Sequence, residues 1–438
     1  MTLPTSAHRV STRCLAAGLT TVFATCVYAP FASAQELTPA PEPTANVRGH
    51  YEGDDFIPEV RVSAPDTESC PQATWPAEPV TTSEAVSAGS APTPLAVTYT
   101  GPCGVSAPAG FAVSEDVVAS SWLVADIDTG DIVAMKDPHG RYRPASIIKV
   151  LLALVAIRDL PLDKEIVVSH DSAAQEGSAV GIVEGGRYTV NDLLHGLLLA
   201  SGNDAAHALA QELGGDVAAL NAVNELAANL GMTDTRVATY SGLDAPGMSS
   251  SAFDLALAYR AAFANPDFAR IADTDFYPFP AQEEAEGFEV WNDNHLYLND
   301  PDGIGGKTGY TDDANHTFAG AVNHEGRRLL AVILDTASTR ARPWEQAQHL
   351  LHEAYRFEPT QAVASLNAPT ADMGSARPAD TETATPQAPT APADQAAGSA
   401  ATMWRSIAIV GGVAVLALAA LVLSLLSRGS TTPGRRRR

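Results

Sequence analysis

Apolar positions along the middle of the chain follow a strand spacing, then a helix spacing, then a strand spacing again. Segments bounded by turn residues predict strands over 121–128, 131–135, 317–322 and 328–335. Turns are expected at Asp128-Thr129-Gly130 and His324-Glu325-Gly326. Because strands at both ends enclose the helical part, the pattern predicts an α+β fold whose terminal strands share one antiparallel sheet.

Helix-like spacing fills the region between these strands. An apolar run over 146–157 follows Pro144, a residue favoured in the first turn of a helix. Thr189 and Asp192 have the spacing of a capping box for a helix over 190–199. Further helices are predicted over 204–213, 216–230, 251–263 and 343–355. We expect them to form a helical subdomain beside the sheet.

The first 34 residues have the features of a secretory signal peptide, predicted over 1–34. Arg9 and Arg13 give it a positive start, and the following residues to Tyr28 are mostly apolar. Ala32-Ser33-Ala34 matches a small-residue cleavage site. A membrane anchor is the alternative, but the apolar run is too short and too rich in threonine. The pattern predicts export.

A second apolar segment lies near the other end. Residues 407–426 carry no charge and are long enough to cross a bilayer, so a transmembrane helix is predicted over 404–427. The tail at 428–438 is rich in arginine and is expected in the cytoplasm. The sequence therefore predicts a single-pass protein of the cell membrane with its folded domain outside.

Two segments beside the folded domain lack core-forming residues. Residues 361–403 are dominated by Ala, Thr, Pro and Asp and are predicted to be a disordered linker. Residues 35–110 form an extension rich in Pro, Thr, Ser and Ala that contains Cys70 and Cys103. In an exported protein these cysteines predict a disulfide, with two free thiols as the alternative. One catalytic domain is predicted over 111–360.

Composition and charge narrow the class of protein. With 45% hydrophobic and 18% charged residues, the chain is not disordered throughout. Four cysteines are too few for a disulfide scaffold or a cysteine-rich zinc protein. Removing the eight arginines of the two end segments leaves 19 basic and 51 acidic residues, a net charge of −32. Such a surface is soluble and repels anions, so no nucleic-acid partner is expected.

The first candidate for chemistry is Ser146-Ile147-Ile148-Lys149. On a helix, Ser146 and Lys149 lie on one face, three residues apart. A serine hydroxyl needs a base to become a nucleophile, and a lysine with a lowered pKa can be that base. The apolar neighbours suggest that Lys149 is partly buried. Taken alone, an exposed Ser and Lys would be the alternative.

Two further motifs follow. Ser201-Gly202-Asn203 lies at a predicted break between helices, where its polar side chains can reach a cleft or simply cap a helix. Lys307-Thr308-Gly309 offers a positive charge and a hydroxyl for a carboxylate, with a glycine-rich hairpin as the alternative. A phosphate-binding loop is excluded because Pro301 stands where its first glycine is required. Two of the four lysines of the chain lie in these motifs.

Together the order S-x-x-K, S-x-N and K-T-G matches penicillin-binding proteins and class A β-lactamases. The contexts Arg143-Pro144-Ala145-Ser146, Leu199-Ala200-Ser201-Gly202-Asn203-Asp204 and Lys307-Thr308-Gly309-Tyr310-Thr311 resemble the low-molecular-weight D-alanyl-D-alanine carboxypeptidases, serine peptidase family S11. Gly177-Ser178 and Ser241-Gly242-Leu243-Asp244 also resemble that family. The resemblance covers about 120–357 and implies a β-lactamase/DD-peptidase-like α+β fold.

The resemblance also implies a role for each motif residue. Ser146 would be the acylated nucleophile and Lys149 its general base. Ser201 and Asn203 would relay a proton and hold the peptide. The substrate-binding residues would be Lys307, Thr308, Gly309 and Tyr310, with backbone N–H groups of Ser146 and Tyr310 as the oxyanion hole. Arg340 or Arg342 would assist with the substrate carboxylate.

The implied reaction removes the terminal D-alanine of peptidoglycan pentapeptide stems, with β-lactam antibiotics as inhibitors. No cofactor is expected, and no metal, because the histidines show no ligand spacing. One alternative is a class A-like β-lactamase, although no E-x-x-L-N motif lies between Ser201 and Lys307. A second is a penicillin- or wall-binding protein that does not turn over. A third is transpeptidase or endopeptidase action at the same site.

Overall fold

The computed structural model describes residues 49–52, 55–58, 61–77, 79, 92–283 and 285–367. All of these belong to one compact unit of the chain. The predicted signal peptide, transmembrane helix and basic tail, and all but the first residues of the linker, lie outside the described residues. Within the described part, no helix is long and apolar enough to cross a membrane.

One antiparallel sheet organises the molecule, and it contains strands from both ends of the described domain. Its main order is β10-β11-β12-β4-β5-β13, and β3 also pairs with β5. The strands are β3 (Val105–Ser106), β4 (Ser121–Asp126), β5 (Asp131–Lys136), β10 (Gly303–Thr311), β11 (Asn315–His324), β12 (Arg327–Thr336) and β13 (Ala364–Ser365). The pairing of β12 with β4 joins the two ends, as the spacing of apolar residues predicts.

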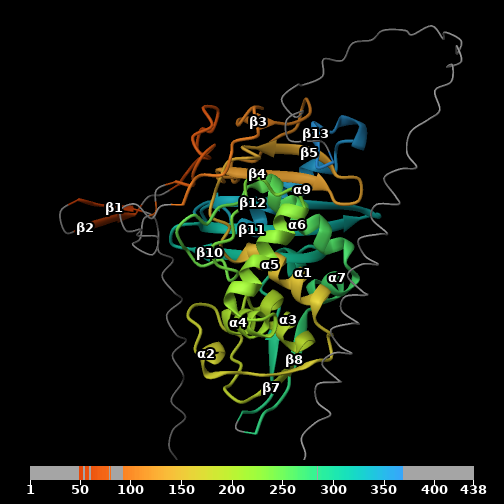
Figure 1. Cartoon of the computed structure of the whole chain (residues 1–438). Coiled ribbons are helices and arrows are strands. Elements are labelled where there is room, and N and C mark those ends of the chain that lie inside the picture. The colour runs from red at the N-terminus through yellow and green to blue at the C-terminus, as the bar shows by residue number, and fades with distance from the viewer. Residues whose placement is uncertain are drawn as a thin grey trace, which may run out of the picture. The chain divides into compact units, whose positions relative to one another are not determined.

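The helices lie mostly between β5 and β10 in the sequence. They are η1 (Ala145–Ile148), α1 (Lys149–Asp159), α2 (His170–Ala173), α3 (Val190–Leu199), α4 (Asn203–Glu212), α5 (Asp216–Asn229), α6 (Ala252–Ala264), α7 (Pro266–Ala272), α8 (His295–Asn299), α9 (Pro343–Ala354) and η2 (Pro359–Gln361). Figure 1 shows the helical block of α1, α3, α4 and α5 on one side of the large sheet. The predicted capping box of Thr189 and Asp192 begins α3.

Successive residues of the sheet strands enter two different cores, because side chains alternate between the two faces of a strand. Leu123 and Leu330 belong to the larger core, formed with the helical block. Trp122 and Leu329 belong to a second core on the other face, where α9 packs. The sheet is therefore buried on both sides, which makes it a rigid support for the residues along it.

Several elements differ from the sequence-based expectation. The glycine-rich stretch at 303–311 is the long edge strand β10, the first arm of a hairpin with β11, and its ladder with β11 compensates for poor strand propensity. The helix predicted from Ser146 begins as the 3-10 turn η1, and α1 starts at Lys149. Strands β3 and β13 extend the sheet beyond the predicted boundaries at 111 and 360. Two-residue strands leave no detectable sequence pattern.

Three small hairpins were also not predicted. They are β1–β2 (Gly49–Glu52 with Asp55–Pro58), β6–β7 (Glu165–Val167 with Arg187–Thr189) and β8–β9 (Phe276–Phe279 with Phe288–Trp291). The last of these leads directly into the loop that carries Asp293. Each strand has only three or four residues, too few for a reliable periodic signal.

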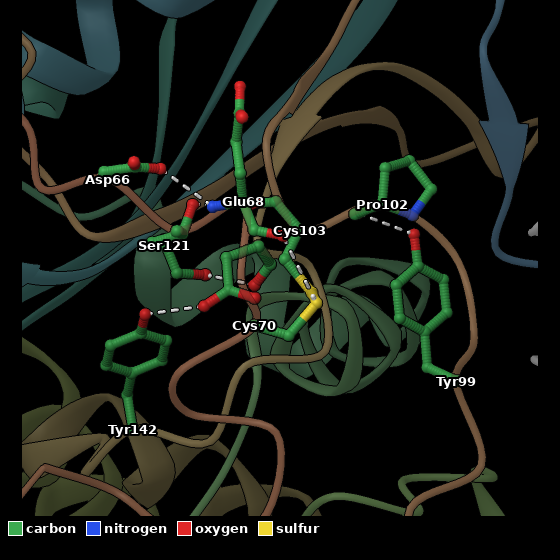
Figure 2. Close-up of a disulfide and its surroundings, with 10 residues drawn as sticks. Asp66, Glu68, Cys70, Tyr99, Pro102, Cys103, Ser121 and Tyr142 are labelled. Atoms are coloured by element: carbon green, nitrogen blue, oxygen red, sulfur yellow. Dashed lines mark hydrogen bonds between the residues drawn. A yellow bond between two sulfur atoms is a disulfide. The ribbon is translucent and has the colours of Figure 1, made fainter.

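The extension is attached to the catalytic domain at its described residues. Cys70 and Cys103 form a disulfide with an S–S distance of 2.06 Å, shown with its surroundings in Figure 2. The buried guanidinium of Arg141 donates to the carbonyl oxygens of Thr74, Leu95 and Ala96, at 2.8–2.9 Å. Arg143, three residues before Ser146, donates to Ala77 O at 2.6 Å. The extension is thus bonded to the segment that leads to Ser146.

Candidate active site

Ser146 lies in η1, at a turn that contacts β11 and the segment around Gly242. Ala145 has a left-handed backbone with φ of 49°, which is unusual for a residue with a side chain. Thr317 on β11 donates to Pro144 O at 2.7 Å. A Cβ atom on Gly242 would lie 2.1 Å from Ala145 O, so only glycine permits this approach. The turn presents the Ser146 hydroxyl in a fixed place.

Lys149 follows one turn later and is fully buried. Its Nζ donates to Ser146 Oγ at 2.8 Å and to Ser241 O at 2.7 Å. Burial holds the pKa of Lys149 well below its ordinary value, and the nearby Lys307 ammonium lowers it further. A lysine with a lowered pKa, in contact with a serine hydroxyl, can accept the hydroxyl proton.

Ser201 and Asn203 come from the break between α3 and α4, where the sequence places them. Ser201 has a left-handed backbone with φ of 59° and is buried, and its Oγ has no hydrogen-bond partner among the described residues. Asn203 Nδ2 donates to Glu176 O at 2.7 Å, whereas its Oδ1 is buried without a partner. Buried polar atoms are normally hydrogen-bonded, so these two can receive or donate bonds to a bound peptide.

Lys307, Thr308 and Gly309 lie on β10, at the edge of the sheet. Lys307 is fully buried, and burial lowers its pKa while the Asp293 carboxylate raises it. The Thr308 hydroxyl donates to Asp293 Oδ2 at 2.9 Å, and Lys307 Nζ lies 3.6 Å from the same oxygen. The ammonium and the hydroxyl therefore already bind one carboxylate, that of the chain itself.

Gly309 brings β10 against the nucleophile turn. A Cβ atom on Gly309 would lie 2.3 Å from Thr317 Oγ1 and 3.1 Å from Ser146 N, so the strand passes next to the Ser146 amide. Tyr310 follows on the same strand. This places the peptide groups of Ser146 and Tyr310 in neighbouring segments, as the resemblance implies for an oxyanion hole.

The fold brings the three motifs into one site. Lys307 and Asp293 both affect the pKa of Lys149, so β10 and the loop before α8 lie within electrostatic range of α1. Asp204, next to Asn203, acts on Lys149 as well. Residues separated by about 160 positions therefore share one environment.

Sequence reasoning missed several residues that build this site. Asp204 is buried, and its carboxylate accepts from the backbone N–H groups of Val180, Gly181 and Ile182. Ser241 supplies the carbonyl that holds Lys149, and Asp244 accepts from Thr311 Oγ1 at 2.7 Å. The sequence identifies the Ser241–Asp244 segment only by its resemblance to the family. Any residue type can supply a backbone carbonyl, so the contact with Lys149 cannot be predicted from residue identity.

The two arginines named as possible helpers differ in their surroundings. Arg340 pairs with Glu115 at 3.2 Å and with Asp116 at 3.4 Å, so its charge is engaged at the surface. Arg342 is exposed at the start of α9, where its backbone N–H donates to the Glu345 carboxylate at 2.6 Å. Neither has a contact that assigns it to the site.

A serine–histidine–aspartate group lies away from this site, on α2, α4 and α5. Ser172 Oγ is 2.8 Å from His207 Nδ1, and His207 Nε2 is 3.7 Å from Asp216 Oδ1. Ser172 is 1% exposed and also contacts Ser169 Oγ at 3.0 Å. The hydrogen bond between Ser172 and His207 joins α2 to α4, which pack against each other. Among the described residues no cluster of His, Cys, Asp or Glu could hold a metal ion.

Comparison with known proteins identifies the family of the chain. The model of the family Peptidase_S11, described as D-alanyl-D-alanine carboxypeptidase, matches residues 106–338. The chain belongs to this family. The D-alanyl-D-alanine carboxypeptidase DacB2 of Mycobacterium tuberculosis is 42% identical over 263 residues, covering 59% of this chain and 90% of that protein. DacD of Escherichia coli is 32% identical over 251 residues, covering 54% of this chain and 63% of that protein.

Solved structures of similar proteins match more than half of the chain. A crystal structure of a D-alanyl-D-alanine carboxypeptidase from Mycobacterium tuberculosis H37Rv aligns with a TM-score of 0.57 at 40% identity, over 59% of this chain and 99% of that one. A Streptomyces K15 DD-transpeptidase mutant aligns with a TM-score of 0.52 at 24% identity, over 55% of this chain and 99% of that one, which shows the fold alone. The mixed α/β fold is that of the DD-peptidases, as the resemblance implies.

Proposed function

We propose that this S11 chain removes the terminal D-alanine from peptidoglycan stems ending in D-Ala-D-Ala through an acyl-enzyme on Ser146. Its family and relatives make it a serine-type D-Ala-D-Ala carboxypeptidase. The observation that carries the mechanism is the 2.8 Å contact between Ser146 Oγ and Nζ of the fully buried Lys149. Burial favours the neutral amine, and only a neutral amine can take the serine proton.

In the acylation step, Lys149 accepts the proton of Ser146 as Oγ attacks the carbonyl carbon of the penultimate D-alanine. The backbone N–H groups of Ser146 and Tyr310 stabilise the oxyanion. When the C–N bond breaks, the leaving amine receives a proton, relayed from Lys149 through the Ser201 hydroxyl. The products of this step are free D-alanine and a peptidyl ester on Ser146.

In the deacylation step, water attacks the ester carbonyl and gives up a proton to the neutral amine of Lys149. The ester bond breaks, Ser146 Oγ takes that proton back, and the shortened stem leaves with a carboxylate. During acylation, Lys307 and Thr308 bind the carboxylate of the terminal D-alanine, and in both steps Asn203 holds the peptide backbone. The proton first taken from Ser146 leaves with D-alanine, and the proton taken from water replaces it on Ser146, so the cycle regenerates the enzyme.

β-Lactams belong to the same proposal, because their strained amide and their carboxylate imitate the reacting end of the substrate. Acylation of Ser146 by penicillin would follow the first step, and slow deacylation would leave the enzyme inhibited. A class A-like β-lactamase remains the alternative, and a penicillin-binding protein without turnover is a further one. The absence of an E-x-x-L-N motif between Ser201 and Lys307 favours the carboxypeptidase.

We also propose that the catalytic domain acts outside the cell, held to the membrane by the predicted span at 404–427. Two features of the sequence support this: the uncharged segment 407–426 and the arginine-rich tail that follows it. Peptidoglycan lies on the same side of the membrane as the proposed catalytic domain. The predicted linker at 361–403 would allow the domain to reach stems along the wall.

Release of D-alanine tests the proposed function. The full-length chain in mild detergent would be given diacyl-L-Lys-D-Ala-D-Ala, and free D-alanine would be measured over time. We expect Ser146→Ala to lose at least about 10³-fold in rate. Ser365→Ala, a serine change on β13 at the far edge of the sheet, is the matched control and should keep the wild-type rate.

Fluorescent penicillin separates the alternatives. A long-lived label on wild type, absent from Ser146→Ala, is expected of a carboxypeptidase. Rapid label turnover would indicate a β-lactamase. A stable label without any D-alanine release would indicate a binding protein, and equal D-alanine release by wild type and Ser146→Ala would overturn the assignment of the nucleophile.

A further inference from the structure

Asp293 places a carboxylate at the pair of groups proposed to bind the substrate carboxylate. Its Oδ2 accepts from the Thr308 hydroxyl at 2.9 Å and lies 3.6 Å from Lys307 Nζ. Lys307 Nζ is otherwise 3.2 Å from Thr308 O and 3.3 Å from Thr308 Oγ1. The carboxylate that pairs with this ammonium is therefore one of the chain itself.

The backbone around Asp293 is held by several hydrogen bonds, whereas its side chain is partly exposed. Asn292 Nδ2 donates to Thr274 O at 3.0 Å, and Asn294 Oδ1 caps α8 by accepting from Leu296 N at 3.1 Å. The Asp293 backbone N–H donates to Leu199 O at 2.9 Å, beside the Ser201 turn. The side chain itself is 37% exposed. Rotation about its χ angles can thus move the carboxylate without moving the loop.

One oxygen of this carboxylate also lacks a partner. Asp293 Oδ1 is buried and has no hydrogen bond in the described part of the protein. A buried, unsatisfied carboxylate oxygen costs free energy, so the contact with Thr308 and Lys307 is not the best environment that the group could find. The arrangement is one that a competing ligand can displace.

We propose that Asp293 is a specificity-determining residue: its carboxylate occupies the position that the terminal carboxylate of a substrate needs at Lys307 and Thr308. A substrate with a free C-terminal carboxylate must displace Asp293 to bind, and two carboxylates cannot share this pair without repulsion. A substrate whose C-terminus is amidated does not compete for the same charge. Lys307 favours substrates with a free C-terminal carboxylate over amidated ones, and Asp293 therefore makes this preference smaller. This inference rests on the proposed role of Lys307 and Thr308.

The same charge acts on the general base. The groups that influence Lys149 come from three neighbouring elements: Lys307 on β10, Asp204 on α4 and Asp293 itself. Asp293 and Asp204 raise the pKa of Lys149, against burial and Lys307. Tyr259 on α6, which donates to Ile147 O at 2.9 Å, also faces this region and stays protonated because burial raises its pKa. Removing the Asp293 charge should therefore shift the acid limb of the activity profile to lower pH.

The test compares two peptides in five forms of the full-length protein: wild type and the variants Asp293→Asn, Asp293→Ala, Asp267→Asn and Lys307→Ala. Diacyl-L-Lys-D-Ala-D-Ala and its C-terminal amide yield the same product, diacyl-L-Lys-D-Ala, which is quantified by chromatography. In Asp293→Asn we expect KM for the free carboxylate to fall about three- to tenfold, with KM for the amide changed less than about twofold. Asp293→Ala should act in the same direction. Asp267→Asn on α7, an exposed aspartate paired with Arg270 at 3.5 Å, is the matched control.

A purely structural role for Asp293 predicts equal changes for both peptides and no movement of the pH profile, and that result would overturn the inference. The rate of acylation by penicillin is an independent test, because penicillin also bears a carboxylate. This rate should be higher in Asp293→Asn than in wild type. If wild type and Lys307→Ala show no preference between the two peptides, the proposed role of Lys307 has failed instead. A wild-type preference that Asp293→Asn leaves unchanged refutes only the role of Asp293.

Discussion

Lys149 illustrates how a single residue acquires its chemistry from its surroundings. In water a lysine is charged at neutral pH and cannot act as a base. Here complete burial and the neighbouring Lys307 lower its pKa, while Asp204 and Asp293 limit the effect. The hydrogen bonds to Ser146 Oγ and Ser241 O fix the amine where the serine proton must go.

The residue scale yields a prediction on pH dependence. Neutral Lys149 predominates above its pKa, so penicillin acylation of wild type should decline as the pH falls through that lowered value. Lys149→Arg should be inactive across the whole range, because a guanidinium stays charged and cannot accept the proton. Stopped-flow experiments with a fluorescent penicillin, from about pH 5 to about pH 9, measure the acylation rates of wild type and of Lys149→Arg.

Lys164→Arg is the matched control for that experiment. Lys164 is a partly exposed lysine that pairs with Glu212 away from the site, and its replacement should leave the profile of wild type unchanged. Acylation of Lys149→Arg at a rate near that of wild type would show that another group takes the serine proton.

At the scale of elements, two short segments determine the site. Strand β10 passes so close to η1 that a Cβ atom on Gly309 would lie 3.1 Å from Ser146 N. The extension accepts hydrogen bonds from Arg141 and Arg143, which precede the nucleophile turn in the sequence. The turn is thus next to a sheet edge and follows residues bonded to a segment with no secondary structure of its own at these contacts.

The disulfide provides the prediction at this scale. It closes a loop with a sequence separation of 33 residues, which contains the carbonyl groups bound by Arg141 and Arg143. Loss of such a cross-link costs roughly 3–4 kcal/mol of folding free energy on the chain-entropy model. Cys70→Ser with Cys103→Ser should therefore lower the stability measured by denaturant unfolding.

Reduction of wild type with dithiothreitol should reproduce the effect of the double variant, and dithiothreitol should not affect the double variant itself. Acylation by penicillin should also slow, because the segment before Ser146 loses part of its support. An unfolding midpoint equal to that of oxidised wild type would show that the disulfide contributes nothing to the stability of the domain.

At the scale of the whole molecule, one sheet built from both ends of the domain carries β10 beside the helices. The helical block supplies Lys149, Ser201 and Asn203, and the sheet supplies Lys307 and Thr308. The active site lies where these two parts meet, so neither forms it alone. The proposed linker and membrane span at 361–427 would confine this site to the space near the membrane.

Truncation tests the proposed anchor. A chain ending before residue 404 should be secreted into the medium, whereas the full-length chain should sediment with membranes. Because the proposed site lies entirely within the described domain, kcat for the diacyl tripeptide should stay within about twofold of the full-length value. A full-length chain found in the medium, uncleaved, would refute the membrane-spanning role of residues 404–427.

The sequence by itself determined the elements whose signals are local. Helix α3 follows from its capping box, the β11–β12 and β4–β5 hairpins follow from apolar runs around turns, and the order of the three motifs predicts the family. These features depend on residues within a few positions of one another, and local propensity and pattern record such relations. The family match then confirms the carboxypeptidase expectation.

Only the tertiary structure decided the features that depend on distant partners. Strand β10 exists through its ladder with β11, since a glycine-rich segment has little strand propensity of its own. The contact of Asp293 with Thr308 and the burial of Lys149 join residues that no local pattern connects. A pKa and a hydrogen bond across the fold are set by three-dimensional distance and by exclusion of water, and neither is encoded in the spacing of residues along the chain.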